Sequence, residues 1–225
     1  EKPPCHTLSQ LRELAGHARS QFCMAGLQKR FSTVNRLLRP QLATAIDYNY
    51  RYLTGLYPEG DPAVELFIHP IDNLVHLFGE VSQVNIKRSK NNRTWFITLE
   101  HISKVTGILQ VSTDHSWKLP VDELLVNTQK SIITASYPNT VSSLKKSAAW
   151  FNIPFEKISK SPAIKQVLLD NNNFIPTALN NTLAVQGFLG EIEYFLKMTE
   201  KNEIDAAHHL KSLLPVYEII ERIRQ

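Results

Sequence analysis

The sequence has little cysteine and no long hydrophobic run, and each absence excludes a class of protein. Its two cysteines, Cys5 and Cys23, are too few for a disulfide-stabilised scaffold, and we expect a free thiol at each. No apolar run approaches the roughly 20 residues that a membrane-spanning helix needs. Apolar residues make up 43% of the 225 residues and charged residues 20%, which is a globular composition. We expect one large domain or two small ones.

The short motifs that mark common enzyme classes are also missing. The sequence has no Walker loop and no Gly-x-Gly-x-x-Gly fingerprint for a dinucleotide. It lacks Gly-x-Ser-x-Gly, His-Glu-x-x-His and Cys-x-x-Cys as well. We therefore predict that the protein is not an enzyme, has no catalytic residues and needs no cofactor.

Two polar pairs on predicted helices are the remaining candidates for chemistry. Asp205 and His208 have an Asp-x-x-His spacing, but no further ligand with a metal-site spacing follows them. Glu65 and His69 are one helical turn apart, which favours a local interaction over metal binding. No metal site is predicted.

Most of the chain has the apolar periodicity of helices. Thr7 and Gln10 form a capping box that begins a helix running to about residue 31. Pro40 and Pro62 suit the first turn of further helices. After Thr7, helices are expected over residues 7–31, 40–56, 62–81, 121–134, 163–169, 181–199 and 203–224, with a kink or break at Pro215.

One region has the alternation of a β-hairpin instead. Val84 and Ile86 alternate with polar residues, and a polar turn separates them from the β-forming run at 94–99. Residues 100–113 fit either a third strand or a helix that ends at Gly107. The expected fold is mainly α, a multi-helix domain with a small antiparallel hairpin or three-stranded meander near 83–113. We expect an N-terminal region at 1–120 and a C-terminal region at 121–225, or one continuous domain.

Residues 144–161 have the outline of a helix-turn-helix. Ala148 is small where the two helices would cross, and Asn152 tolerates the backbone of the turn. Pro162 limits the second helix to about two turns, which is short for a recognition helix. The alternative is an ordinary helical corner without a DNA-binding role.

Basic residues gather around two elements, this motif and the tip of the predicted hairpin. The chain has a net charge of +4, and lysine and arginine contacts to phosphates supply much of the affinity of a nucleic-acid complex. The candidate nucleic-acid-binding residues are Lys87, Arg88, Lys90, Arg93, Lys145, Lys146, Lys157 and Lys160.

These patterns predict a non-enzymatic, nucleic-acid-binding accessory or regulatory protein of the transcription-regulator kind. Its partner would be duplex DNA, held mostly by phosphate contacts. The alternative is a helical protein–protein adaptor or a structural subunit of a larger complex. We expect no membrane span and a cytoplasmic location, although a removed signal is compatible with a chain that begins at Glu1.

Overall fold

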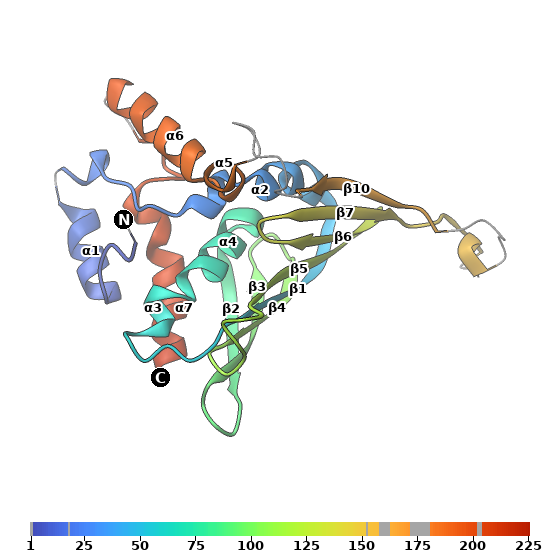
Figure 1. The fold of residues 1–225 in the computed structure, drawn as a ribbon, viewed down its shortest axis with the longest axis horizontal. Helices are drawn as coiled ribbons and strands as arrows, with labels where there is room; N and C mark the ends of the chain where they lie inside the picture. The colour runs from blue at the N-terminus through green and yellow to red at the C-terminus, as the bar shows by residue number, and fades with distance from the viewer. Residues whose placement is uncertain (1, 18, 152, 158–162, 172–180, 202–203) are drawn as a thin grey trace.

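The fold combines one large β-sheet with helices gathered against one of its faces (Figure 1). The structure is a computed structural model that describes residues 2–17, 19–151, 153–157, 163–171, 181–201 and 204–225. Within these ranges, no helix has both the length and the apolar character needed to cross a bilayer.

Eight strands form the main sheet, in the order β10-β7-β6-β5-β1-β4-β3-β2. The central pair β1 and β4 is parallel, and the other neighbouring pairs are antiparallel. The strands are β1 (Ala45–Leu53), β2 (Val81–Arg88), β3 (Thr94–His101), β4 (Thr106–Ser112), β5 (Val121–Thr128), β6 (Ser131–Ser136), β7 (Thr140–Lys145) and β10 (Lys165–Asp170). The short strands β8 (Ala149–Trp150) and β9 (Ile153–Pro154) pair separately.

Seven α-helices lie within the described ranges, and their ends follow from local capping. Thr7 caps the first with a full capping box, as the sequence predicts, and Asp61 caps the third through the amide of Ala63. The helices are α1 (Leu8–Gly16), α2 (Thr33–Leu38), α3 (Pro62–Glu65), α4 (Ile68–Phe78), α5 (Thr182–Gln186), α6 (Phe188–Lys201) and α7 (Leu214–Arg224). Short 3-10 turns include η2 (Gln28–Phe31), η3 (Arg39–Thr44) and η4 (Phe155–Lys157).

The hydrophobic core lies between the helices and one face of the sheet. Tyr48 and Tyr50 of β1 point inward and are buried, whereas Asn49 and Arg51 point outward and are exposed. Gly107 of β4 faces Tyr48, and a Cβ atom there would lie 2.1 Å from the tyrosine ring. The glycine therefore lets a large aromatic ring lie flat across the central parallel pair.

The prediction of a mainly α fold is wrong, because several segments with mixed periodicity form strands. Residues 40–56 are η3 followed by β1, in which the tyrosines repeat every second residue. Residues 121–134 form β5 and the start of β6, and residues 163–169 lie largely in β10. The predicted helix at 7–31 ends at Gly16. Asp122 and Glu123 would complement the dipole of a helix that starts at Val121, but this segment pairs with β1 and β6 and forms a strand.

The helix-turn-helix prediction at 144–161 is also wrong. The segment continues from β7 into β8, β9 and η4. Backbone pairing of Ala149 with Pro154 makes a small hairpin where two crossing helices were expected. Asn152 and residues 158–162 lie outside the described residues.

The hairpin prediction at 83–99 is confirmed by β2 and β3, and residues 106–112 form the third strand. Pro215 lies in the first turn of α7, so it begins that helix and does not kink it. Both cysteines are free thiols, as expected. The division at residue 120 stays a prediction, and the sheet draws strands from both sides of it.

Candidate functional site

The predicted nucleic-acid-binding residues do not form one surface. The hairpin tip belongs to β2 and β3 at one edge of the sheet, whereas β7 and the segment after it lie at the other edge (Figure 1). Lys87, Arg88, Lys90 and Arg93 are therefore separated from Lys145, Lys146 and Lys157 by the width of the sheet. Lys160 lies outside the described residues.

Three of these cations are engaged within the protein. Arg88 donates a hydrogen bond to the carbonyl of Ile223 at 2.5 Å, and Arg93 pairs with Asp114 at 3.6 Å. Lys146 donates to the carbonyl of Thr128 at 2.5 Å. These contacts connect the strands of the sheet to neighbouring segments.

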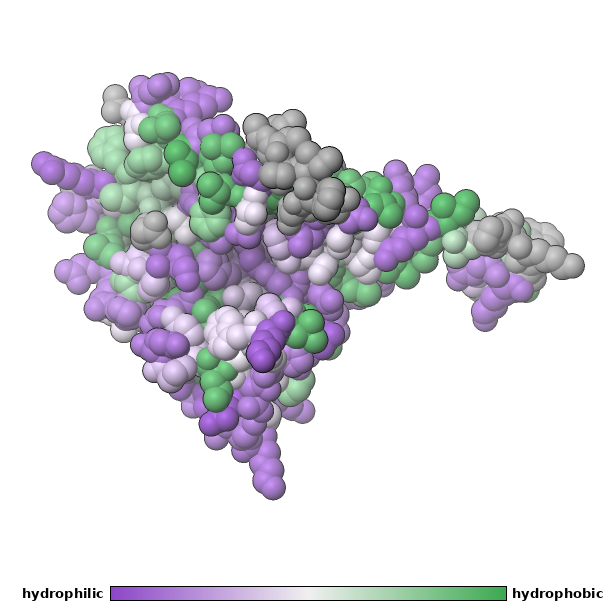
Figure 2. All heavy atoms as spheres, viewed as in Figure 1, coloured by the Kyte–Doolittle hydropathy of each residue, from purple (hydrophilic) through white to green (hydrophobic). Residues whose placement is uncertain are grey.

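The structure instead brings Lys2 and His69 together at a cavity of about 430 Å³, which we call the inner cavity. Its walls come from the N-terminal segment, the segment before η2, the first turn of α4 and one side of α6. Figure 2 shows hydrophobic residues gathered around α5 and α6, on the side of the molecule where this wall lies. The lining residues are Lys2, Met24, Gly26, Gln28, His69, Phe188, Glu191, Ile192 and Phe195.

His69 is the most unusual side chain of this cavity. Its Nδ1 is buried and has no hydrogen-bond partner among the described residues. Burial, together with the positive charges of Lys29 and Lys2, lowers the pKa of His69 to about 3. The imidazole is therefore neutral near neutral pH, and a neutral imidazole can accept a proton.

Lys2 is held at the inner cavity by the backbone of α3. Its Nζ donates a 2.7 Å hydrogen bond to the carbonyl of Glu65, four residues before His69. The Glu65 carboxylate turns away to accept hydrogen bonds from the Tyr57 hydroxyl at 2.7 Å and the Asp61 amide at 3.1 Å. The predicted local pair of Glu65 with His69 is therefore not observed.

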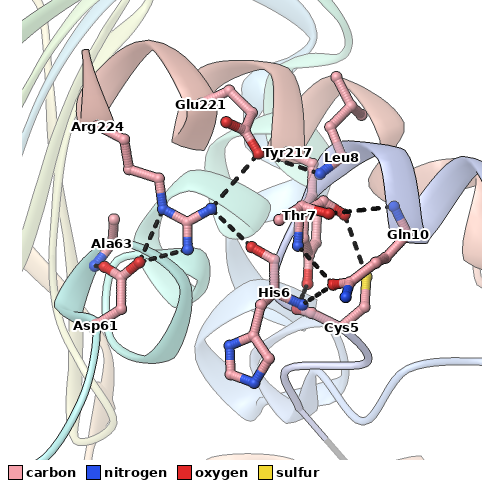
Figure 3. A network of polar contacts seen from close by, with 10 residues as sticks. All are labelled: Cys5, His6, Thr7, Leu8, Gln10, Asp61, Ala63, Tyr217, Glu221 and Arg224. Carbon is pink, nitrogen blue, oxygen red and sulfur yellow. Dashed lines mark hydrogen bonds and ion pairs between the residues drawn. The ribbon is translucent and has the colours of Figure 1, made fainter.

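A polar network fixes the segment that carries Lys2 (Figure 3). Arg224 at the end of α7 forms an ion pair with Asp61, the cap of α3, and donates to the carbonyl of His6 at 2.6 Å. Tyr217 donates to the carbonyl of Cys5 at 2.7 Å. These contacts tie the N-terminal segment to the start of α3, so that Lys2 and His69 are placed by one connected framework.

A second cavity of about 230 Å³, the middle cavity, adjoins the first at Gln28 and His69. Lys29 lies in it with its Nζ within 5.2 Å of the ring centre of Tyr52 and 4.8 Å of that of Tyr137. The ammonium also forms an ion pair with Asp122.

Buried amides hold this arrangement rigid. Tyr137 donates to Asn35 at 2.7 Å and accepts from Asn73 at 2.8 Å. Tyr50 donates to Asp122 at 2.8 Å and accepts from Lys29 at 3.2 Å. Burial raises the pKa of both tyrosines well above the usual value, so they remain protonated donors.

A third cavity of about 260 Å³, the outer cavity, shares Tyr52, Asp122 and Tyr137 with the middle one. Trp117 and Pro120 form its rim, and Trp117 is 53% exposed. The three cavities follow one another through these shared lining residues, from Lys2 to Trp117, and we call them together the groove.

Neutral buried histidines predict a loss of stability in acid. His76, like His69, has a pKa lowered to about 3, through burial and the charges of Arg30, Arg39 and His208. In the unfolded chain both titrate near about 6.5, so the unfolded state binds more protons below that pH. We expect the free energy of unfolding to fall below about pH 6.5 by up to about 1.4 kcal/mol per pH unit for each histidine.

Urea unfolding at several pH values measures this effect. Stability should be full above about pH 6.5 and decline as the pH falls towards about 3. The variant His69→Gln/His76→Gln should show a flatter profile than the unchanged protein. Equal stability at about pH 7 and about pH 5 in the unchanged protein would contradict the assignment of neutral histidines.

Sequence reasoning missed this site, although two features pointed to it. His69 is a polar residue in the mainly apolar segment from Val64 to Phe78, and its buried Nδ1 atom has no hydrogen-bond partner among the described residues. The segment Lys2-Pro3-Pro4 precedes the first predicted helix, and Lys2 is held by the Glu65 carbonyl as part of the cavity wall. Asp205 and His208 form a local pair at 2.7 Å, and no cluster of three metal-binding side chains occurs in the described ranges.

Comparison of the fold with solved structures gives a clear result, although the sequence matches no protein-family model and no curated protein. A dehydrogenase from Chromobacterium violaceum has a TM-score of 0.75 at 18% identity, over 99% of this chain and 67% of that one. Levoglucosan dehydrogenase, in complex with NADH and levoglucosan, has a TM-score of 0.75 at 11% identity, over 100% of this chain and 70% of that one. A Gfo/Idh/MocA family oxidoreductase from Vibrio cholerae has a TM-score of 0.69 at 11% identity, over 100% of this chain and 69% of that one.

The chain has the fold of these oxidoreductases. The predictions of a non-enzymatic DNA-binding protein and of a helical adaptor are therefore wrong: the framework is a mixed α/β one shared with dehydrogenases, and the expected recognition element is a pair of short strands. The remaining part of each of those longer chains has no counterpart in this one.

The residues of this chain fit a substrate better than they fit a dinucleotide. A dinucleotide site needs a glycine-rich turn from a strand into a helix N-terminus, and the sequence has no such fingerprint. Among the described pairs of the main sheet, the parallel one joins β1 to β4 and lacks that turn. The inner cavity, in contrast, offers a neutral imidazole and an ammonium to a small polar ligand.

Proposed function

We propose that this chain supplies the substrate site of an oxidoreductase that interconverts a secondary alcohol and a ketone on a hydroxyl-rich small molecule. A nicotinamide dinucleotide, held by a part of the enzyme outside this chain, would exchange the hydride. The observation that carries the proposal is His69, a neutral imidazole whose buried Nδ1 has no partner among the described residues and which lines the same cavity as the Lys2 ammonium. Such perturbed groups in a cavity favour an active site over a structural one.

The two side chains suit the two proton requirements of this reaction. In alcohol oxidation, the carbon loses a hydride and the hydroxyl loses a proton. His69 accepts that proton as the hydride leaves, which requires its pKa to rise above the lowered value of the free chain once the substrate is bound. Lys2 donates a hydrogen bond to the same oxygen and stabilises its developing negative charge. In the reverse direction, protonated His69 returns the proton to the oxygen as the carbonyl carbon gains the hydride.

The fold supports this assignment at a coarser level. Its likeness to levoglucosan dehydrogenase covers the whole of this chain, including the segments that carry Lys2 and His69. Because the identity is 11%, the likeness concerns the framework, and the chemistry is argued from the cavity. The groove is lined by hydroxyl, amide and charged groups between aromatic rings, a surface suited to polyols.

An activity panel tests the proposal. The whole protein that carries this chain would be assayed for NAD(P)H formation with levoglucosan, myo-inositol, glucose and methyl glucoside, using NAD⁺ and NADP⁺ in turn. We expect oxidation of at least one of these compounds. Lys2→Met should lower kcat by about 10²–10³-fold, because it removes a donor to the developing oxyanion.

The matched control is Lys90→Met, which changes an exposed lysine between β2 and β3 that lines none of the three cavities. It should leave kcat unchanged. Activity that survives Lys2→Met at the level of the control would contradict the proposed role of the inner cavity.

A further inference from the structure

The groove extends well beyond the reacting residues, and we infer that its middle and outer cavities bind the neutral, non-reacting sugar ring of a glycoside. This inference rests on the proposed function, which places the reacting hydroxyl in the inner cavity. His69 lines both the inner and the middle cavity, and Asp122 lines both the middle and the outer one. A ligand that reacts at His69 and is longer than one ring would therefore extend past Lys29 towards Trp117. A single small ring would leave the outer cavity unused.

The middle cavity presents a hydrogen-bond donor and an acceptor side by side. Lys29 has three N–H donors, of which Asp122 and Tyr50 take two. Asp122 keeps lone pairs beyond those used by Lys29 and Tyr50. A sugar hydroxyl both accepts and donates, so it can accept from Lys29 while donating to Asp122 or to a neighbouring group.

The charge of these cavities selects a neutral ligand over a phosphorylated one. Lys29 is neutralised by its ion pair with Asp122, and His69 is uncharged near neutral pH. Among the described residues that line the outer cavity, the charged ones are Asp122 and Glu123, both acidic. Phosphate groups are bound by a surplus of arginine, lysine and amide donors, which is not offered here.

Trp117 is exposed but held in place. Its Nε1 donates a 2.7 Å hydrogen bond to the carbonyl of Leu56, and a Cβ atom on Gly55 would lie 2.4 Å from the indole. The Tyr57 ring lies beside it, with 6.5 Å between ring centres. A rigid indole at the rim of a polar groove offers a flat apolar face on which the C–H face of a sugar ring can stack at little entropic cost.

Calorimetric titration of the full chain tests the inference without requiring catalysis. The probes are methyl glucoside, the disaccharides cellobiose, maltose, sucrose and trehalose, and the anions glucose phosphate and UDP-glucose. We expect at least one disaccharide to bind about tenfold more tightly than methyl glucoside, and both anions to bind more weakly than that disaccharide. Binding of either anion more tightly than every disaccharide would overturn the inference, and so would equal binding of the disaccharides and methyl glucoside.

Substitutions at two positions, Trp117 and Lys29, locate the binding. Trp117→Ala should abolish the tighter binding of the disaccharide relative to methyl glucoside, and Trp117→Phe should retain most of that difference in affinity. Lys29→Met should weaken disaccharide binding by about tenfold or more, whereas Lys90→Met should leave it unchanged. Unaltered disaccharide binding in Trp117→Ala would overturn the inference.

The outcome separates this inference from the proposed function. Disaccharide binding that depends on Trp117, with no NAD(P)H formation in the whole protein, would contradict the proposed function alone. Efficient oxidation of glucose phosphate in preference to any glycoside would overturn the inference alone.

Discussion

Replacing His69 with glutamine is expected to lower kcat for alcohol oxidation by about 10²–10⁴-fold, the usual contribution of a positioned general base. Glutamine keeps a polar side chain of similar length but cannot accept a proton. The loss should appear in kcat more than in KM, because the imidazole acts on the reacting hydroxyl in the transition state. Steady-state kinetics of NAD(P)H formation measure the effect.

The matched control for this variant is His115→Gln, which changes an exposed histidine in the loop before Trp117. It should retain full kcat. His69→Gln should also remain folded near neutral pH, since it replaces a neutral side chain by another neutral one. A kcat for His69→Gln within about twofold of the control would contradict the role of His69 as the general base.

Breaking the Arg30–Asp72 pair is expected to destabilise the fold by about 3–5 kcal/mol, the usual cost of leaving one buried charge unpaired. The side chains are 6% and 1% exposed, and Arg30 Nε donates to Asp72 at 2.9 Å. Arg30 also donates to the hydroxyl of Ser212 at 3.1 Å and to the carbonyl of Ala207 at 2.5 Å. The pair thus joins η2, α4 and the segment before α7, which surround the groove.

Denaturant unfolding of Arg30→Met measures this cost. The surface pair of Arg12 with Glu218 is the control, since its side chains are 62% and 55% exposed. Arg12→Met should change the free energy of unfolding by less than about 1 kcal/mol. Equal losses of unfolding free energy in Arg30→Met and Arg12→Met would show that the buried pair does not stabilise the fold more than the surface pair does.

The double variant Arg30→Met/Asp72→Leu separates pairing from packing. Replacing both charges by apolar groups removes the unpaired carboxylate, so much of the stability lost in Arg30→Met should return. A double variant no more stable than Arg30→Met would indicate that the arginine acts through its other hydrogen bonds alone.

The sequence predicts individual elements better than the architecture. The capping box at Thr7, the helices that follow Asp61 and the hairpin at 83–99 depend on local chemistry, and all three are observed. The central strand β1 was expected to be a helix. Its inward tyrosines alternate as expected for a strand. Pro40, a few residues earlier, suits the first turn of a helix, and local sequence alone therefore favours a helix over this segment.

The site could not be predicted because it depends on contacts far apart in the chain. Lys2 and His69 line one cavity because Arg224, more than 200 residues after the N-terminal segment, ties that segment to Asp61. The middle cavity likewise joins Lys29 to Asp122 across 93 residues. The lysines around the predicted helix-turn-helix are close together in the sequence, so they are recognised without a structure. Charge alone, however, does not distinguish a binding surface from a solvent-exposed one.

A structure of the whole protein with a nicotinamide dinucleotide and an oxidisable polyol bound tests the central claim most directly. The account predicts that one hydroxyl oxygen of the polyol lies within about 3.2 Å of both Lys2 Nζ and a ring nitrogen of His69. It also predicts that the rest of the molecule points along the groove towards Lys29. A polyol bound elsewhere, with the inner cavity filled by water alone, would contradict it.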